Sequence, residues 1–431
     1  MVKQSSKSHK GKRRQSGAPG RKRNLAQVAS AGASRCLVAR ECGACQYIDM
    51  PYADQLAMKD ARMAELFAEF AAPAAPAEPA GPAEIRPIRG MDDPFHYRNK
   101  VTSPFAPGKR GPNGGREILT GMYAAGTHRL VPTDCCLLEN EQAQQVIAAI
   151  RAIMRKHGNA PYDENKGTGF MRHVIVRVGH ESAEVLVTLV TNDEAFPNSK
   201  AFCRELMRRC PFVTTIVQNV NTRQTNVILG SREHRLYGPG FILDTLCGLS
   251  FRISSQSFYQ VNATQTAILY DTAIELAHLD GTQRVIDAYC GTGTIGLVAA
   301  KRGAAEVIGV DSVESAIRDA RENARHNGIE NAQFVTADAT AFMRELAEGG
   351  EHADVVLMDP PRAGSTPEFL DAVARLAPDR VVYVSCNPAT QVRDVRHLAQ
   401  HGYRLQVVQP VDMFPHTDHV ECVVLMSKAK E

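Results

Sequence analysis

Short apolar runs alternate with amphipathic segments over the C-terminal part of the chain. The segments carry apolar residues at helical spacing, whereas the runs are rich in Val, Ile and Leu and show little polar alternation. Strands of this kind, separated by helices, are typical of a parallel sheet that is buried on both faces. The pattern therefore predicts an α/β domain over residues 256–431, with strands at 284–290, 307–311, 333–338, 353–359, 380–385 and 421–426.

The part of the chain before residue 256 is less regular. Residues 52–70 predict a helix with Leu56, Met63 and Phe67 on its apolar face, and strand-like runs follow from residue 97 onward. Between them, residues 71–84 are rich in Ala and Pro, a composition that opposes a regular helix and favours a linker. We therefore expect a β-rich central region within residues 31–255.

A glycine turn follows the first predicted strand of the α/β domain. Gly291, Gly293 and Gly296 fit the spacing G-x-G-x-x-G and lead into an apolar helix. Glycines at such a turn let backbone amides approach a nucleotide, and Asp311, at the end of the next strand, suits ribose hydroxyls. This Rossmann-like arrangement serves both S-adenosylmethionine and nicotinamide enzymes, so a dehydrogenase is an alternative at this point.

Chemically active side chains stand at the ends of the later strands. Asp359 in Asp-Pro-Pro-Arg and Cys386 in Ser-Cys-Asn-Pro each follow a strand, and Glu421 begins the last one. Ligands of such sheets bind at the C-terminal strand ends, so we expect these residues to share one site with Tyr289. A cysteine and a carboxylate in one site suit covalent catalysis on an electron-poor ring.

Five motifs, in this order, resemble the RNA uracil-5-methyltransferases: Gln256–Asn262, Asp287–Gly293, Asp359–Arg362, Ser385–Pro388 and Asp412–Glu421. Members of that family act on tRNA or on 23S rRNA. The resemblance implies C5-methylation of a uridine in RNA, with Cys386 as the nucleophile that adds to C6 and Glu421 as the base. The contacts that we expect with S-adenosylmethionine come from Gln260, Tyr289, Gly291, Gly293, Thr294, Asp311, Asp338 and Asp359.

A cysteine triplet with the spacing Cys-x5-Cys-x2-Cys lies near the N-terminus, and Cys135 and Cys136 follow much later. Thiols at this spacing indicate a metal site rather than disulfides, and four thiolates suit zinc or an iron–sulfur cluster. The resemblance favours a 4Fe-4S cluster on Cys36, Cys42, Cys45 and Cys136, with Cys135 as the alternative fourth ligand. Uracil methylation needs no electron transfer, so we expect the cluster to have a structural or RNA-positioning role. The cluster is typical of the 23S rRNA branch, which makes tRNA the alternative substrate.

Charge is distributed unevenly along the chain. Residues 1–23 hold nine Lys and Arg and no acidic residue, whereas the other 41 basic residues are outnumbered by 47 acidic ones. We expect residues 1–30 to form a disordered basic arm that is attracted to RNA phosphates. No run is long enough to span a membrane and the arm lacks the apolar segment of a secretion signal, so we expect a cytoplasmic monomer.

Two alternatives from other classes leave motifs unexplained. A noncatalytic iron–sulfur RNA-binding protein would use the cysteine triplet but would need neither Cys386 nor Glu421. A dehydrogenase would use the glycine turn but not Asp359–Arg362 or Ser385–Pro388. The sequence therefore favours the methyltransferase.

Overall fold

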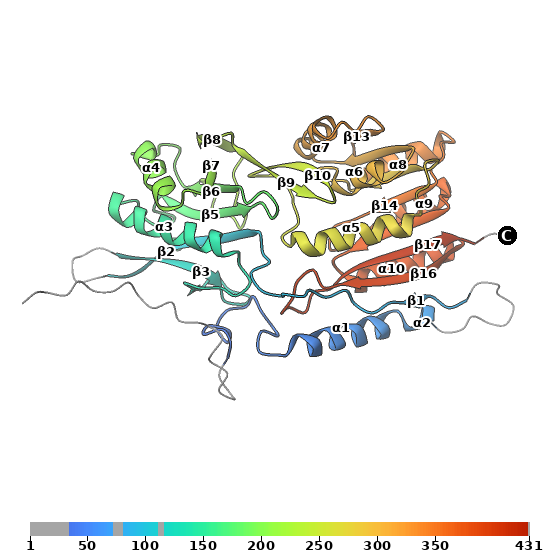
Figure 1. The fold of residues 1–431 in the computed structure, drawn as a ribbon, viewed down its shortest axis with the longest axis horizontal. Helices are drawn as coiled ribbons and strands as arrows, with labels where there is room; N and C mark the ends of the chain where they lie inside the picture. Colours follow the sequence, from blue (N-terminus) through green and yellow to red (C-terminus); the bar gives the residue numbers. More distant parts are fainter. Residues whose placement is uncertain (1–33, 72–80, 111–115, 430–431) are drawn as a thin grey trace, which may run out of the picture.

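The computed structural model describes residues 34–71, 81–110 and 116–429, so the expected arm at 1–30 lies outside the described residues. A central domain and a C-terminal domain lie side by side, each built on its own sheet (Figure 1). Within the described ranges, no helix is both long and apolar enough to cross a membrane.

The C-terminal domain contains an eight-stranded sheet in the order β1-β16-β17-β15-β14-β11-β12-β13. Its strands are β1 (Glu84–Ile85), β11 (Arg284–Ala288), β12 (Glu306–Asp311), β13 (Ala332–Thr336), β14 (Val355–Met358), β15 (Arg380–Ser385), β16 (Tyr403–Val411) and β17 (Glu421–Lys428). The five neighbouring strands β15, β14, β11, β12 and β13 run parallel, as expected. β17 is antiparallel to β15 and β16, so the expectation of a parallel sheet is wrong at this edge. A short connection joins β16 to β17, and such connections produce antiparallel neighbours.

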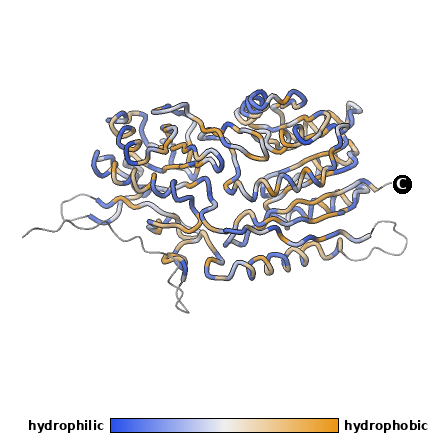
Figure 2. Tube along the Cα trace, viewed as in Figure 1, coloured by the Kyte–Doolittle hydropathy of each residue, from blue (hydrophilic) through white to orange (hydrophobic). Residues whose placement is uncertain are grey.

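Helices cover both faces of this sheet. One face carries α5 (Ala263–Ala277), α6 (Thr294–Lys301) and α7 (Glu314–His326), and the other carries α8 (Ala339–Glu348), α9 (Pro367–Leu376) and α10 (Pro388–Gln400). Val285 and Ile286, neighbours on β11, belong to the two different cores. Hydrophobic and hydrophilic positions alternate along the covering helices in Figure 2, as expected for helices with one buried face.

The segment before the expected linker packs on the C-terminal domain. The expected helix at 52–70 forms as α1 (Tyr52–Leu66) and the short α2 (Ala68–Ala71), and its Met63 and Phe67 join the core under α8–α10. Residues 72–80 lie outside the described residues, and β1 then pairs in parallel with β16. The segment from α1 to β1 therefore belongs structurally to the C-terminal domain, although it precedes the expected boundary at residue 256.

The central domain is a seven-stranded sheet in the order β4-β3-β2-β5-β6-β7-β8, packed against α3 (Glu141–His157) and α4 (Ser199–Arg209). Its strands are β2 (Lys100–Arg110), β3 (Arg116–Tyr123), β4 (Leu130–Pro132), β5 (Met171–Val178), β6 (Val185–Thr191), β7 (Val213–Val220) and β8 (Arg232–Tyr237). A hairpin of β9 (Phe241–Leu246) and β10 (Leu249–Ser254) leads into the C-terminal domain. The predicted fold class, a Rossmann-like domain after a β-rich central domain, is confirmed.

Candidate active site

A cavity of about 1180 Å³ opens where the strand ends of the C-terminal sheet meet the central domain. Eight residues of the predicted site line it: Gln260, Tyr289, Gly291, Thr294, Asp311, Asp359, Cys386 and Glu421. The other two predicted residues lie outside its lining. Gly293 is the N-cap of α6, and the Asp338 carboxylate caps α8. The structure thus brings most of the predicted residues together, and their roles stay predictions.

The turn after β11 depends on backbone conformations that favour glycine. Gly291 and Gly293 have φ angles of 54° and 78°, in the left-handed region. A Cβ atom at Gly293 would lie 2.7 Å from the ring of Phe334, so a larger residue could not fit without a shift of that ring. Tyr289 also has a positive φ of 64°, which is uncommon for a residue with a side chain and turns the chain sharply at the cavity wall.

Two carboxylates hold this turn in place. Asp287 accepts the backbone N–H of Gly296 at 2.9 Å, which ties β11 to the first turn of α6. Asp311 accepts the N–H of Gly291 at 3.0 Å through Oδ2 and the N–H of Val313 at 2.8 Å through Oδ1. The turn is therefore ordered by contacts within the protein, and Asp311 lies at the edge of the cavity where a ribose would be expected.

Cys386 and Glu421 lie at adjoining strand ends. The register of β15 and β17 pairs Ser385 with Cys422, which places Cys386 and Glu421 together just beyond the last paired position. Glu421 is buried, with 4% of its surface exposed, whereas Cys386 is half-buried and faces the cavity. A thiol that a ligand can reach therefore stands next to a carboxyl group that water barely reaches.

The turn that carries Cys386 is joined to the Asp-Pro-Pro-Arg loop. The Ser385 hydroxyl accepts the N–H of Asn387 at 3.1 Å, and the Asn387 side chain donates to the carbonyl of Arg362 at 3.1 Å. These contacts fix the two loops that carry Cys386 and Asp359 relative to one another.

Burial changes the ionisation of the catalytic candidates. It raises the pKa of Asp359 to about 7, and burial followed by the charge of Asp359 raises the pKa of Glu421 to about 8. The pKa of the Cys386 thiol is also raised, first by burial and then by Glu421 and Asp359, while Arg362 lowers it. Arg362 is thus a side chain that favours the reactive thiolate.

The raised pKa of Glu421 predicts a pH-dependent stability. The folded protein keeps this proton up to about pH 8, whereas the unfolded chain loses it near the ordinary value of 4.5. The stabilising contribution is therefore full below the unfolded value and is lost as pH rises toward 8. We expect Glu421→Gln to melt above the parent at about pH 8 and the difference to shrink at about pH 5 in calorimetry. Equal melting temperatures at both pH values would contradict a buried, uncharged Glu421.

The cysteines of the expected cluster gather in one corner of the protein. Cys36, Cys45 and Cys136 pack around a small core of Ile48, Tyr97 and Leu138. Burial, followed by the nearby thiols of Cys136, Cys42 and Cys36, raises the pKa of Cys45 to about 12. Cys135 is exposed, unlike the other four cysteines.

The sulfurs of these cysteines are not drawn together around a single point. Among the described residues, the ligand atoms of Asp371, His397 and His401 all lie within 4.8 Å of one another. No group of three or more that includes a cysteine is as close in this part of the chain. One zinc ion would draw its sulfurs closer, because Zn–S bonds are only about 2.3 Å long. Four half-buried thiols that are free of disulfides are a donor set that zinc or an iron–sulfur cluster can accept.

Residues outside the predicted set also line the cavity. Phe258 stands on its wall with 68% of its surface exposed, and Arg98 and Lys100 reach it from the central domain. Burial, and then the charges of Arg177 and Arg98, lower the pKa of Lys100 to about 8, and no described carboxylate forms an ion pair with it. The aromatic Phe258 within the polar run 256–262 was a usable signal in the sequence, whereas the clustering of cations was not.

The chain is similar to known RNA methyltransferases in sequence and in fold. Residues 245–429 match the family model of the tRNA (uracil-5-)-methyltransferases. The chain is 40% identical over 398 residues to a Bacillus cereus protein named "Uncharacterized RNA methyltransferase". This match covers 92% of this chain and 84% of the relative. A protein of Halalkalibacterium halodurans with the same description is 42% identical over 391 residues, covering 91% of this chain and 82% of the relative.

A solved structure extends the similarity to three dimensions. The crystal structure of Pyrococcus abyssi tRNA (uracil-54, C5)-methyltransferase, in complex with S-adenosyl-L-homocysteine, superposes with a TM-score of 0.71 at 28% sequence identity. The match covers 89% of this chain and 86% of that chain, so it includes the central domain as well as the α/β domain.

Proposed function

Because the chain belongs to the RNA uracil-5-methyltransferase family, we propose that it methylates C5 of a uridine in 23S rRNA through a covalent bond between Cys386 and C6 of the ring. Family membership makes the protein an S-adenosylmethionine-dependent RNA methyltransferase. The covalent route is supported by one observation: Cys386, Asp359 and Glu421 meet at neighbouring strand ends on a single cavity.

The chemistry requires a thiol and a base on the same ring. C5 of uracil is a poor nucleophile because the ring is conjugated to two carbonyl groups. Addition of the Cys386 thiolate to C6 moves the electrons of the C5–C6 double bond toward C5 and O4, and C5 can then take up a methyl group. Glu421 removes the remaining C5 proton, after which the double bond re-forms and the C6–S bond breaks. The thiol and the carboxyl group stand at adjoining strand ends on the cavity, as these two roles require, and each must first lose a proton that burial helps it to keep.

S-adenosylmethionine supplies an electrophilic methyl group, and the residues around the glycine turn fit its binding. Asp311, which lines the cavity, would accept hydrogen bonds from ribose hydroxyls, and the positive φ of Tyr289 turns the chain at the cavity wall. Gln260, Thr294 and Asp359 border the same cavity. Gly293 and Asp338, which do not border it, are assigned to shaping the turn and its neighbouring loop.

The cavity also offers features that RNA would use. A uridine must leave its base stack to bring C6 to Cys386, and flipped bases are commonly stacked against aromatic side chains. The exposed ring of Phe258 could stack in this way. Lys100, which forms no ion pair with a described carboxylate, and its neighbour Arg98 would attract phosphates beside the target.

We assign a 4Fe-4S cluster to Cys36, Cys42, Cys45 and Cys136 on the grounds of their partial burial and their spacing in the sequence. Cys136 suits the fourth position better than the exposed Cys135, because its backbone is held by Gln144, which donates to its carbonyl at 2.6 Å and accepts its N–H at 3.1 Å. Such a cluster would join the N-terminal segment to the residues after β4, which is a structural role.

Protein purified without oxygen is expected to be brown and to contain about four irons per chain. Serine at any one of the four assigned positions should remove the colour, because each thiolate binds a different iron. Cys135→Ser is the matched control and should stay brown. Stoichiometric zinc without iron would contradict the cluster, and a colourless Cys135→Ser beside a brown Cys136→Ser would reverse the choice of ligand.

The choice of RNA is open to a direct test. The cysteine set supports 23S rRNA, whereas the similarity to a structure named as a tRNA (uracil-54, C5)-methyltransferase supports tRNA as the second candidate. We would map 5-methyluridine in both RNAs from cells with and without the gene. Loss of a 23S rRNA position is the expected result, loss of a tRNA position would favour the second candidate, and no loss in either RNA would contradict the proposal.

A further inference from the structure

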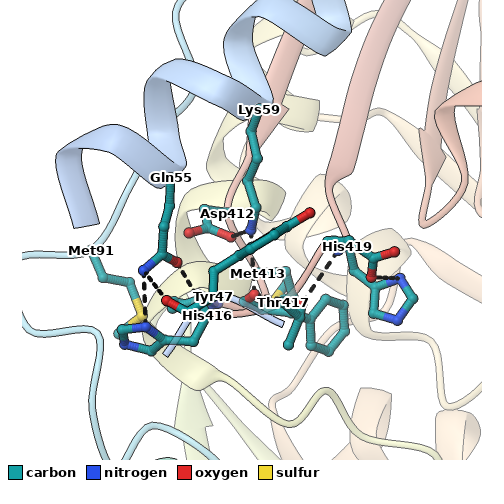
Figure 3. Close-up of polar contacts among 12 residues, drawn as sticks. Tyr47, Gln55, Lys59, Met91, Asp412, Met413, His416, Thr417 and His419 are labelled. Carbon is teal, nitrogen blue, oxygen red and sulfur yellow. Dashed lines mark hydrogen bonds and ion pairs between the residues drawn. The ribbon is translucent and has the colours of Figure 1, made fainter. Parts of the chain in front are cut away.

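The loop that ends at Glu421 is fixed from a distant part of the chain. Val411 pairs with Glu421 across β16 and β17, so residues 412–420 close this hairpin. Figure 3 shows α1 beside the loop, with Lys59 directed at Asp412 and Gln55 at His416. The contacts of these two pairs determine how firmly the loop is held.

The first contact is a buried ion pair. Lys59 Nζ lies 2.6 Å from Asp412 Oδ1, and the two side chains are 2% and 0% exposed. The Tyr52 hydroxyl donates to Asp412 Oδ2 at 2.7 Å. Both oxygens of this carboxylate are therefore held by α1, and loss of either partner would leave a buried group poorly compensated.

The second contact holds a strained turn. His416 has a φ of 68°, a conformation that is unfavourable for a residue with a side chain. Gln55 Oε1 accepts its N–H at 3.0 Å, and Gln55 Nε2 lies 3.1 Å from its ring Nδ1. The carbonyl of His416 also accepts the N–H groups of Gln46 and Tyr47 at 3.0 Å, both in the segment that carries the cysteines. Both the backbone N–H and the backbone carbonyl of His416 are therefore held by hydrogen bonds to other segments.

The composition of α1 indicates that these contacts have a purpose beyond packing. Its buried residues are Gln55, Lys59 and Met63, which follow one another at single-turn spacing. A helix that only packs would place apolar side chains there, because a buried amide or ammonium group costs free energy unless it finds partners. Both polar residues find partners in the loop 412–420. Departures of this kind from the hydrophobic pattern are expected at functional or strained sites.

We infer that Gln55 and Lys59 are positioning residues that set the place of the Glu421 carboxyl through the loop 412–420. Few residues separate His416 from Glu421, and within them the Thr417 hydroxyl accepts the N–H of His419 at 3.3 Å. A shift of the loop therefore moves Glu421, whereas Cys386 is carried by β15 and its own turn. The inference rests on the proposed role of Glu421 as the base. Loss of the contacts of Gln55 or Lys59 should therefore slow the removal of the C5 proton.

Lys59→Met and Gln55→Leu remove the polar contacts while keeping similar side-chain size. Single-turnover reactions would follow two rates, formation of the methylated covalent adduct and its release. Both variants should slow release by about 10-fold to 100-fold, as for a displaced catalytic group, and change formation by less than about two-fold. The matched control is Arg396→Met, which breaks the exposed ion pair of α10 with Glu69 and should leave both rates unchanged.

A double variant separates positioning from stability. Lys59→Met/Asp412→Asn leaves no unpaired buried charge, so it should regain the melting temperature that Lys59→Met loses. Its release of the adduct should remain slow. If Lys59→Met does not fold, the release rate is measured on this double variant instead. Recovery of release together with stability would reduce Lys59 to a structural role, and parental release in both single variants would overturn the inference. Absence of a trapped adduct in Glu421→Gln would instead reject the proposed role of Glu421 as the base, and the inference with it.

Discussion

Cys386→Ala is expected to lose methyl transfer by about four orders of magnitude or more, the scale seen when an enzyme loses its nucleophile. Without the thiolate, C5 of uracil has no means of becoming nucleophilic. Binding of S-adenosylmethionine should survive, because Tyr289 and Gly291 lie in the turn after β11 and Asp311 ends β12, away from the turn that carries Cys386. Transfer of labelled methyl groups to RNA and isothermal titration with the cofactor measure the two properties.

A second cysteine provides the control for this variant. Cys247 is half-buried, donates weakly to the carbonyl of Ala267 and does not line the cavity, so Cys247→Ala should keep parental activity. Comparable turnover by Cys386→Ala and Cys247→Ala would rule out the covalent route.

Glu421→Gln is expected to stop the reaction one step later. The glutamine cannot accept the C5 proton, so addition and methyl transfer proceed while elimination stalls, and turnover should fall by about 10²-fold to 10⁴-fold. A methylated protein–RNA adduct should accumulate and migrate as a slow band on a denaturing gel. The double variant Cys386→Ala/Glu421→Gln should give no such band. Parental turnover without an adduct would show that another group is the base.

The positions of the site residues could largely be predicted from the sequence. Asp311, Asp359 and Cys386 each end or follow an apolar run, and the C-terminal ends of parallel strands meet at one edge of a sheet whatever the details of packing. The direction of β17 could not be predicted in the same way, because a strand buried on both faces has the same apolar pattern in either direction. Its reversal is what brings Glu421, the first residue of β17, next to Cys386.

The support of the site was hidden for a different reason. Lys59 and Asp412 are 353 positions apart, and nothing in either local sequence indicates that they pair. The apolar residues of α1 correctly predicted a helix, but the stripe that it buries contains Gln55 and Lys59. The pKa of Cys386 is likewise set first by burial and then by the charges of Glu421, Asp359 and Arg362, which only the fold brings together.

RNA that contains 5-fluorouridine provides the most direct test of the central claim, which is covalent methylation of uracil at C5. After the Cys386 thiolate adds to C6 and the methyl group reaches C5, that carbon holds fluorine instead of a proton, so Glu421 has nothing to remove and the adduct persists. Nuclease and protease digestion followed by mass spectrometry should find a methylated, fluorinated nucleotide on the peptide that contains Cys386. An unmodified Cys386 peptide, recovered while the same enzyme still methylates ordinary RNA, would contradict the account.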